Sequence, residues 1–388
     1  MTQKAPPQRV RTAVQHPANT REIRWYEHLT IDLLLTVLNR TLFHPWVAWI
    51  AVLSLRAQAT PYTHFAFTIT TGYAVFLTAL AIARTVNRRV AYGLSRPVDL
   101  SEEVVVVTGG ASGLGLLIAQ IYAMRGVSVA VLDVKDEQDI DGWEEGFAAE
   151  YYQCDIGDRR QLEATVERIE KQLGPPTVLI NCAAARINGK SLLSLPAEAF
   201  QRTIQTNLLA VFHTCQLFLP RMLSAENGGT IVNVSSVLGQ LCAAGLSDYS
   251  VSKAGLSALH RTLEAELRTS GDDEKVKMLL IEPGQVATPL FQSVKTPNAF
   301  FAPVLEPVNV AQEIVLAIDD GRAGIIRMPT YAMLVNWYAV LPASIQRLAR
   351  WLTGIDYAVP PPTVEKRDDC GGPSPKRSQE DQKSVDKD

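Results

Sequence analysis

Tyr249 and Lys253 stand four residues apart in the helical stretch DYSVSKAGLSALHRTLEAEL. Residues four apart lie on one face of a helix, so we expect the two side chains to emerge together. A free tyrosine has a pKa near ~10 and is a poor base at neutral pH. A nearby ammonium group favours the phenolate. The pair therefore predicts a tyrosine that exchanges a proton with a substrate at physiological pH.

A serine and an asparagine precede this pair and complete the predicted catalytic set. Ser236 lies 13 residues before Tyr249, just past the apolar run TIVNV, where a hydroxyl can hold the substrate oxygen beside the tyrosine. Asn207 falls within the helical stretch QRTIQTNLLAVFHT and is placed to hold a water between the lysine and solvent.

A glycine-rich turn follows the apolar run Val104–Thr108 and opens a helical stretch. Glycines permit a tight turn and let backbone amides approach a pyrophosphate, while the positive end of the helix points at the phosphates. The spacing is G-x-x-x-G-x-G, and the alternative is a purely structural turn. The residues of this turn predicted to bind a dinucleotide are Thr108, Gly109, Ser112, Gly113, Leu114 and Gly115.

Asp133 closes the next β-rich run, 18 residues after Gly115. A carboxylate at this position can hydrogen-bond the adenosine ribose hydroxyls and repels a 2′-phosphate. The glycine turn contains no Arg or Lys that would attract such a phosphate. The sequence therefore favours NAD(H), with NADP(H) less favoured; the alternative is an Asp that serves only as a turn residue.

The elements around these residues alternate short apolar β-rich runs with amphipathic helical stretches. Continuous apolar runs separated by helices predict a parallel sheet covered on both faces. We expect a Rossmann-type, doubly wound α/β domain over residues 100–328. The runs that we assign to strands are residues 104–108, 128–133, 177–181, 230–234 and 276–282, and residues 114–125 are assigned to a helix.

Two apolar runs, residues 41–55 and 65–83, lie before this domain. The second has no charge over 19 residues, about the length that crosses a hydrocarbon core of roughly 30 Å. The first is shorter and contains Pro45, which favours half of a hairpin. We expect residues 26–99 to form a membrane-anchoring helical hairpin; the alternative is a hairpin packed on the globular domain. Arginines on both sides of the pair place both of its ends in the cytoplasm, although Arg56 between the runs opposes full crossing.

The remaining segments have weaker signals. Residues 1–25 are polar and Pro-containing, and residues 359–388 are Pro-rich and then charged, so we expect both to be disordered. Residues 329–358 are rich in Trp and Leu and predict an amphipathic helix, on a membrane surface or as a lid over the substrate.

Composition excludes several other classes of function. A net charge of −3 provides no basic field for nucleic acid. The five cysteines contain no CxxC pair and share no short spacing with histidines, so we expect neither a metal site nor a disulfide framework.

In order and spacing these residues resemble the short-chain dehydrogenase/reductase family, over roughly residues 101–328. The stretches ARINGKSLLSLP, FLPRML and AGLSDYSVSKAG are more narrowly similar to its membrane-associated retinol and 17β-hydroxysteroid dehydrogenase branch. The resemblance implies that Tyr249 transfers the proton, Lys253 also binds the nicotinamide ribose, Ser236 orients the substrate and Asn207 completes a proton relay. It also implies further residues near the cofactor, namely Asp155, Ile156, Asn181, Pro283, Gly284, Val286 and Thr288.

Two departures from the family pattern stand out. The family's N-N-A-G is here Asn181-Cys182-Ala183-Ala184, in which a turn glycine has become alanine. The crossover over residues 134–149 is short and acidic, close to the minimum of about a dozen residues.

The expected function is oxidation of a lipophilic alcohol, or reduction of the matching carbonyl, at the endoplasmic reticulum or a lipid droplet with the catalytic domain facing the cytoplasm. Retinoids, steroids and long-chain lipids remain open as substrates. The alternatives are an anchored NADPH-dependent keto-lipid reductase and a non-catalytic membrane or lipid-droplet scaffold. The family resemblance also allows a homodimer.

Overall fold

The computed structural model describes residues 29–359, with the exception of residues 141, 144–147, 293, 295 and 297. The two ends that we expect to be disordered lie almost entirely outside the described residues.

Seven parallel strands form one sheet at the centre of the molecule, in the order β3-β2-β1-β4-β5-β6-β7. The chain builds outward from β1 to β3 and then crosses back to β4, so the order reverses between β1 and β4. This confirms the predicted doubly wound Rossmann-type fold, in which ligands bind beyond the carboxyl ends of the strands at that reversal. The strands are β1 (Val104–Thr108), β2 (Ser128–Asp133), β3 (Ala149–Gln153), β4 (Val178–Asn181), β5 (Gly229–Val234), β6 (Val276–Pro283) and β7 (Gly324–Met328).

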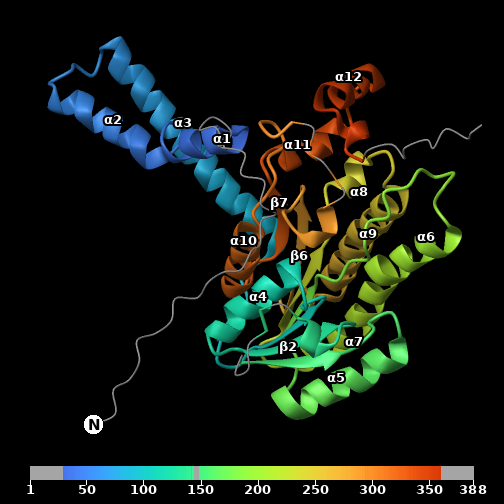
Figure 1. The fold of residues 1–388 in the computed structure, drawn as a ribbon. Coiled ribbons are helices and arrows are strands. Elements are labelled where there is room, and N and C mark those ends of the chain that lie inside the picture. The colour runs from blue at the N-terminus through green and yellow to red at the C-terminus, as the bar shows by residue number, and fades with distance from the viewer. Residues whose placement is uncertain are drawn as a thin grey trace, which may run out of the picture.

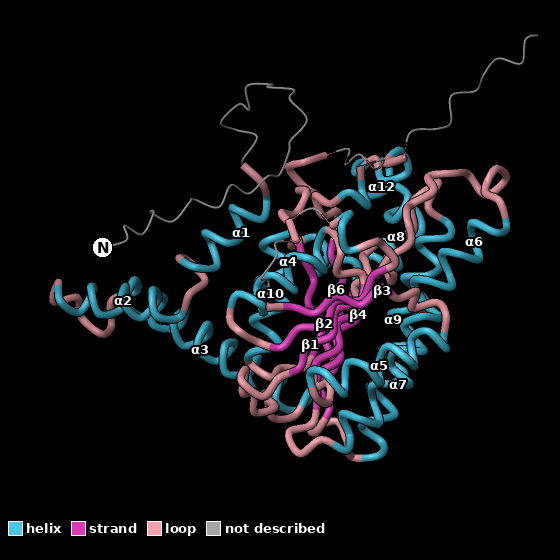
Figure 2. The backbone as a smooth tube through the Cα atoms, turned by 60° about the horizontal axis from the view of Figure 1, so that its bottom comes forward, coloured by secondary structure: helices cyan, strands magenta, loops and turns pink. Residues whose placement is uncertain are grey.

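Helices cover both faces of the sheet, as Figure 2 shows. On one face α4 and α10 bury the side chains of Val105 and Val107, and on the other α5, α7 and α9 bury those of Val104 and Val106. Strands buried on both faces need apolar residues at every position, which is why these runs do not alternate. The covering helices are α4 (Gly113–Met124), α5 (Arg159–Leu173), α7 (Ala210–Ser224), α9 (Ser247–Ser270) and α10 (Pro307–Asp319). Shorter helices are α6 (Ala197–Ile204) and α8 (Leu238–Leu241).

Before the sheet, α2 and α3 form a helical hairpin that projects from the domain (Figure 1). The two helices pack through Ala48, Val52, Ala74 and Leu77, and the Trp49 indole donates to Thr78 Oγ1 at 3.0 Å. Only α3 is long and apolar enough to cross a membrane, with a mean hydropathy of 1.8 in a window that is 11% buried; this comparison covers the helices of the described residues. The helices are α1 (Ile31–Arg40), α2 (Pro45–Ala57) and α3 (Phe65–Tyr92).

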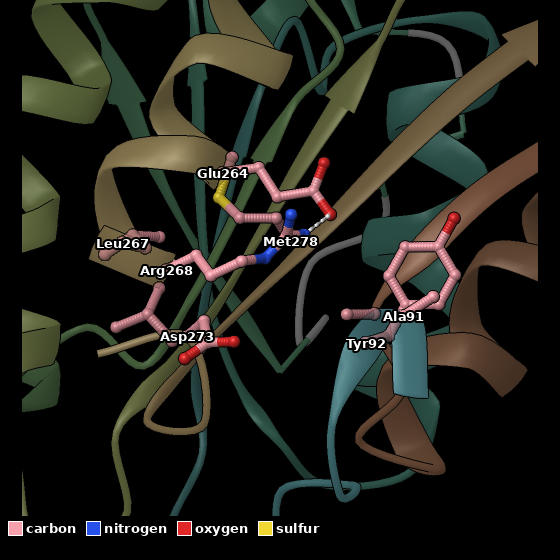
Figure 3. A pocket seen from close by; sticks show the side chains of 9 residues that line it. Ala91, Tyr92, Glu264, Leu267, Arg268, Asp273 and Met278 are labelled. Carbon is pink, nitrogen blue, oxygen red and sulfur yellow. Dashed lines mark hydrogen bonds and ion pairs between the residues drawn. The ribbon is translucent and has the colours of Figure 1, made fainter. Parts of the chain in front are cut away.

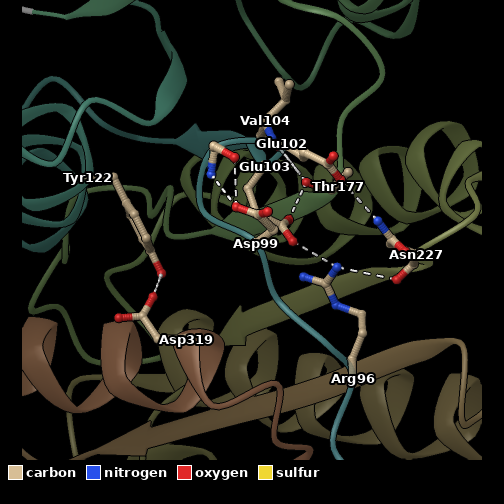
Figure 4. Close-up of polar contacts among 10 residues, drawn as sticks. Arg96, Asp99, Glu102, Glu103, Val104, Tyr122, Thr177, Asn227 and Asp319 are labelled. Carbon is tan, nitrogen blue, oxygen red and sulfur yellow. Dashed lines mark hydrogen bonds and ion pairs between the residues drawn. The ribbon is translucent and has the colours of Figure 1, made fainter.

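The last turn of α3 contacts the domain at the amino ends of β6 and β7. Ala91 and Tyr92 line a small depression there with residues of α9, among them Glu264 and Arg268 (Figure 3). Just beyond, Arg96 forms a buried ion pair with Glu103 at 2.8 Å and donates to the Asn227 carbonyl at 3.3 Å (Figure 4). The segment that follows α3 therefore fixes the hairpin to the sheet.

Two helices follow β7 where we expected one. They are α11 (Tyr331–Tyr338) and α12 (Ala343–Thr353). Pro342 is the N-cap of α12. Because proline disfavours the helical conformation of the residue before it, the apolar stretch cannot continue as one helix.

Candidate active site

Tyr249 lies at the start of α9 with its side chain 3% exposed. The preceding Asp248 fixes this turn, because its Oδ2 accepts from Asn188 Nδ2 at 2.6 Å and from Thr203 Oγ1 at 2.9 Å. Burial raises the pKa of the Tyr249 phenol above its ordinary value, while a hydrogen bond with Ser236 acts to lower it. Burial therefore has the larger effect of the two, and the expected stabilisation of a phenolate by Lys253 stays a prediction.

Lys253 lies one turn further along α9, with Nζ 5.8 Å from the centre of the Tyr249 ring. Its ammonium donates to the Val234 carbonyl at the end of β5, at 2.8 Å. Burial lowers the pKa of Lys253 to about 8. The lysine therefore remains mostly protonated at neutral pH and lies beside the phenol, as the four-residue spacing predicts.

Ser236 follows β5 and is 1% exposed. Its Oγ accepts from the Leu238 amide at 3.2 Å and donates to the Pro283 carbonyl at 3.4 Å. The hydroxyl is thus held at the carboxyl end of the sheet, within reach of Tyr249.

Asn207 lies in a single π-helical turn, Gln205–Leu209, between α6 and α7. Its Oδ1 accepts from the Ala185 amide at 2.8 Å, and its Nδ2 donates to Ser252 Oγ at 3.0 Å. Such wide turns often occur at functional sites. Asn207 therefore links the segment after β4 to the turn of α9 that carries Tyr249.

The glycine turn has the shape that a dinucleotide requires. Gly109 and Gly113 adopt φ values of 69° and 56°, in the left-handed region that glycine favours. A Cβ on Gly115 would lie 2.4 Å from the Gly109 carbonyl oxygen. Any other residue at position 115 would therefore prevent the helix from beginning so close to the strand. Ser112 is the N-cap of α4, and the free amides of the first turn of α4 face the carboxyl edge of the sheet. These residues fit an NAD(P) pyrophosphate.

Asp133 ends β2 beside this turn. Its Oδ2 accepts from the Ala111 amide at 3.0 Å, and its Oδ1 accepts from Val134 at 2.8 Å. The carboxylate is thus fixed at the edge of the glycine turn, where the adenosine ribose would lie.

The structure brings most of the other predicted cofactor residues to the same edge. Thr108 Oγ1 accepts from the Cys182 amide at 3.2 Å and ties the end of β1 to that of β4. Thr288 faces the glycine turn, since a Cβ on Gly113 would lie 3.5 Å from its Cγ2. Asp155 Oδ1 accepts from the Gly157 amide at 2.8 Å in the turn after β3. Leu114, Ile156 and Val286 are buried, and Pro283 and Gly284 end and follow β6.

Asn181 is the exception, because its side chain points into the core. Its Nδ2 donates to Asn233 Oδ1 at 2.8 Å, and its Oδ1 accepts from Thr214 Oγ1 at 2.8 Å. Asn233 Nδ2 in turn lies 3.2 Å from His260 Nδ1. Burial lowers the pKa of His260 to about 4, so the ring is neutral and accepts this bond. The Asn181 amide therefore supports the sheet under the site.

The altered turn after Asn181 is accommodated without strain. Among the described residues, those other than glycine with a positive φ are Ala59 and Cys242. Ala184 therefore has an ordinary backbone conformation, and the loss of the family's glycine needs no left-handed alanine.

Tyr249 belongs to an apolar cluster whose side chains pack around its ring. Phe291 makes an edge-to-face contact with the ring at 6.0 Å between centroids. The buried members of the cluster are Ile187, Ala243, Leu246, Tyr249, Phe291, Val294 and Ala358. Ile355 and Val359 pack against it. Tyr249 is thus surrounded by apolar side chains.

Sequence reasoning missed Asp248 and the Asn233–His260 pair, while the lid predicted over residues 329–358 includes the covering residues Ile355 and Ala358. A signal existed for two of them: Asp248 directly precedes Tyr249, and Asn233 interrupts an otherwise apolar strand. The contact of this cover with Tyr249 itself has no local signal, because the two lie more than a hundred residues apart in the chain.

Comparisons with known proteins show the family of this chain. A family described as short chain dehydrogenase matches residues 103–299. Short-chain dehydrogenase/reductase 3 of Homo sapiens is 34% identical over 264 residues, which cover 66% of this chain and 85% of that protein. Retinol dehydrogenase 10-B of Danio rerio is 31% identical over 277 residues, which cover 64% of this chain and 81% of that protein. The chain belongs to the short-chain dehydrogenase/reductase family.

An X-ray structure of an alcohol dehydrogenase from the archaeon Thermococcus sibiricus, complexed with 5-hydroxy-NADP, matches with a TM-score of 0.49 and 22% identity. The match covers 58% of this chain and 95% of that chain. Family membership confirms the predicted oxidoreductase class, whose cofactor is NAD(P).

Proposed function

We propose that this protein interconverts a lipophilic alcohol and its carbonyl compound with NAD(H) at a membrane. The observation that carries the proposal is the apolar cluster around Tyr249, which includes Ile187, Phe291 and Ala358. A polar substrate would lose its hydration against these side chains, whereas burial of hydrocarbon is favourable by roughly 25 cal/mol per Å². The names of two relatives, retinol dehydrogenase 10-B and retinol dehydrogenase 10, support this substrate class.

In alcohol oxidation, Tyr249 Oη takes the hydroxyl proton while hydride leaves the carbinol carbon. In carbonyl reduction, hydride adds to the carbonyl carbon and the Tyr249 phenol donates a proton to the carbonyl oxygen. A nicotinamide bound at this site would accept the hydride in oxidation and supply it in reduction. Ser236, which hydrogen-bonds the phenol, holds the substrate oxygen, and the Lys253 cation stabilises negative charge on Tyr249.

Two further residues position this proton exchange. The Val234 carbonyl fixes Lys253 Nζ, and Asn207 fixes the turn of α9 that carries Tyr249 through Ser252. Ser252 Oγ donates to the Tyr249 carbonyl at 2.7 Å, so the chain of contacts ends on the tyrosine itself. We infer that Asn207 completes the proton path between Lys253 and solvent.

NAD(H) is the proposed cofactor, and Asp133 selects it over NADP(H). The glycine turn would hold the pyrophosphate, and Asp133 the adenosine ribose. A carboxylate already fixed by the Ala111 amide cannot turn aside for a 2′-phosphate without losing that hydrogen bond. Asp155 and Ile156 would border the adenine, and the segment Pro283–Thr288 the nicotinamide.

Membrane attachment is proposed through the α2–α3 hairpin. Exposed apolar side chains along it include Trp46, Ile50, Leu53, Phe65 and Phe76. A soluble protein rarely exposes an apolar patch of this extent, whereas lipid would cover it.

The test is turnover by the full-length protein in phosphatidylcholine vesicles, against retinols, hydroxysteroids and long-chain alcohols, with NAD and NADP compared. We expect kcat/KM with NAD to exceed that with NADP, and to rise with the apolar length of the alcohol. A preference for NADP or for short, water-soluble alcohols would contradict the proposal.

A further inference from the structure

Helix α12 presents its polar side to the domain and its apolar side to the outside. Arg350 holds it in place: Nη1 donates to the Leu241 carbonyl and Nη2 to the Cys242 carbonyl, each at 2.7 Å, and Nε donates to Asp356 at 3.0 Å. The opposite face carries Ile345, Leu348 and Leu352, which are 46%, 54% and 63% exposed. No residue of this helix is buried. A helix that docks on a soluble domain normally buries its apolar stripe, so this orientation requires an apolar surface outside the protein.

Neighbouring segments extend the same apolar surface. On α11, Met333, Leu334 and Trp337 are 61%, 62% and 70% exposed. Phe300 and Phe301 are also exposed and lie in edge-to-face contact. Trp337 and Trp351 are large amphipathic side chains of the kind enriched at membrane–water interfaces.

Helix α1 connects this surface to the membrane hairpin. At its start, the Ile31 amide donates to the Phe300 carbonyl at 3.1 Å, and Asp32 Oδ1 accepts from the Thr330 amide at 2.8 Å. Just past its end, the Leu42 carbonyl accepts from Tyr73 Oη of α3 at 2.8 Å. None of its residues is buried, and Leu34 and Val37 are 47% and 50% exposed. Figure 1 shows α1 between the hairpin and α11.

We propose that α1, the Phe300–Phe301 turn, α11 and α12 form an apolar collar that rests on the surface of a lipid bilayer. The inference rests on the membrane attachment proposed above. The collar is continuous with the hairpin, because it begins where α1 meets α3 and carries the same kinds of exposed aliphatic and tryptophan side chains. Since the hairpin is proposed to lie in lipid, lipid is also the partner that we propose for the collar. Its total apolar area would add to the affinity of the anchor.

The collar also places the cover of the active site at the lipid surface. Ile355 and Ala358 directly follow α12 and pack in the cluster that buries Tyr249. A substrate dissolved in the bilayer therefore meets this cover without crossing water, and α12 on the membrane holds the cover at the point of loading.

The proposal is tested with full-length protein on phosphatidylcholine vesicles that contain a lipid spin-labelled near its headgroup. We expect the emission of Trp351 to be quenched about twofold or more, measured as the difference between wild type and Trp351→Phe. The triple variant Ile345→Ser/Leu348→Ser/Leu352→Ser should still float with the vesicles through the hairpin. In that variant Trp351 should escape quenching, and KM for a vesicle-dissolved alcohol should rise about fivefold with kcat unchanged.

The control variant is Met124→Ser/Leu316→Ser, which removes exposed apolar side chains at the opposite edge of the sheet and should behave as wild type. If wild type floats but Trp351 is not quenched, the collar is overturned while the proposed anchor stands. If wild type does not float, both are overturned. If lipid does not quench Trp351 in wild type and the triple variant changes the oligomeric state, the collar is a protein interface and the proposal is overturned.

Discussion

At the scale of single residues, burial is the dominant influence on the Tyr249–Lys253 pair. It raises the pKa of the phenol and lowers that of the ammonium to about 8. Both shifts favour the uncharged forms, so a phenolate forms only when a positive charge and the Ser236 hydroxyl stabilise it. At neutral pH the phenol is therefore protonated, and the lysine retains most of its charge.

Asp133 is the residue that we propose determines the choice of cofactor. Replacing Asp133 with Ser keeps a hydrogen-bonding group near Ala111 but removes the charge that opposes a 2′-phosphate. We expect the ratio of kcat/KM for NAD to that for NADP to fall about tenfold or more, since hydrogen bonds to charged groups contribute about 1.5–3 kcal/mol. Steady-state kinetics with both cofactors measures this ratio, and an unchanged ratio would show that Asp133 is only a turn residue.

His260 makes stability depend on pH. Its pKa is about 4 in the folded protein and near ~6.5 when unfolded. Between these values the unfolded chain binds more protons, so this contribution to stability is complete above about pH 6.5 and is lost as the pH falls through about 4.

We expect wild type to lose up to about 3 kcal/mol of unfolding free energy over this window from His260. Denaturant unfolding at pH 7 and pH 4.5 measures the loss, with His260→Asn as the comparison. A variant that loses as much stability as wild type would show that other groups cause the acid sensitivity.

At the scale of elements, five strands (β1, β2, β4, β5 and β6) were predictable because each is a short, mostly apolar run that the sheet buries on both faces. Strands β3 and β7 are only partly buried and were not assigned from the sequence. Strands β1 and β2 have the predicted bounds, and β4, β5 and β6 differ by one residue at one end. The parallel topology likewise brings the glycine turn, Ser236 and Tyr249 to the same edge of the sheet. Local sequence was sufficient for both.

Contacts that join distant segments were not predictable. The π-helical turn at Asn207 has no sequence signal, because it depends on the Ala185 amide and on Ser252 of α9. The cover over Tyr249 depends on Arg350, which donates to two carbonyls at the end of α8. Asn181 was expected at the cofactor, but its partners in β5 and α7 lie in the core.

The buried Arg96–Glu103 pair fixes the hairpin to the sheet and can be tested as an element. The two side chains are almost fully buried, and Glu103 also accepts from Thr177. Removing one charge leaves the other uncompensated, so Arg96→Met should cost about 3–5 kcal/mol of unfolding free energy. The double variant Arg96→Met/Glu103→Leu should cost less than Arg96→Met alone, because Arg96 Nε and Nη2 already lack partners. Calorimetric unfolding compares wild type with the two variants. A double variant that loses at least as much unfolding free energy as Arg96→Met would contradict a coupled pair.

At the scale of the whole molecule, the catalytic domain and the helical hairpin with α1 are joined at both ends of the sheet. The last turn of α3 contacts the amino ends of β6 and β7, while α1 reaches the segments near the carboxyl ends. With the hairpin in a membrane as proposed, the catalytic domain would keep a fixed orientation to the bilayer. This fits an enzyme whose substrate is dissolved in lipid.

The anchor is tested by placing charge in the middle of α3. Val75 and Phe76 are 51% and 62% exposed, so Val75→Lys/Phe76→Lys should fold but lose membrane retention. Each lysine near the centre of a span opposes insertion by about 2.5–3.5 kcal/mol. Fractionation of expressing cells should move the variant to the soluble fraction, while Val90→Lys, beside the arginines at the end of α3, stays with membranes. Equal retention of the two variants would contradict a spanning α3.

The central claim is that Tyr249 exchanges the proton during NAD-dependent oxidation of a lipophilic alcohol. The most direct measurement compares wild type and Tyr249→Phe in vesicles, with NAD and the best alcohol of the panel, and follows both turnover and NAD binding. We predict a fall in kcat of about 10²–10⁴-fold with NAD affinity unchanged, because only the proton-exchanging hydroxyl is removed. Turnover by Tyr249→Phe within a few-fold of wild type would contradict the account.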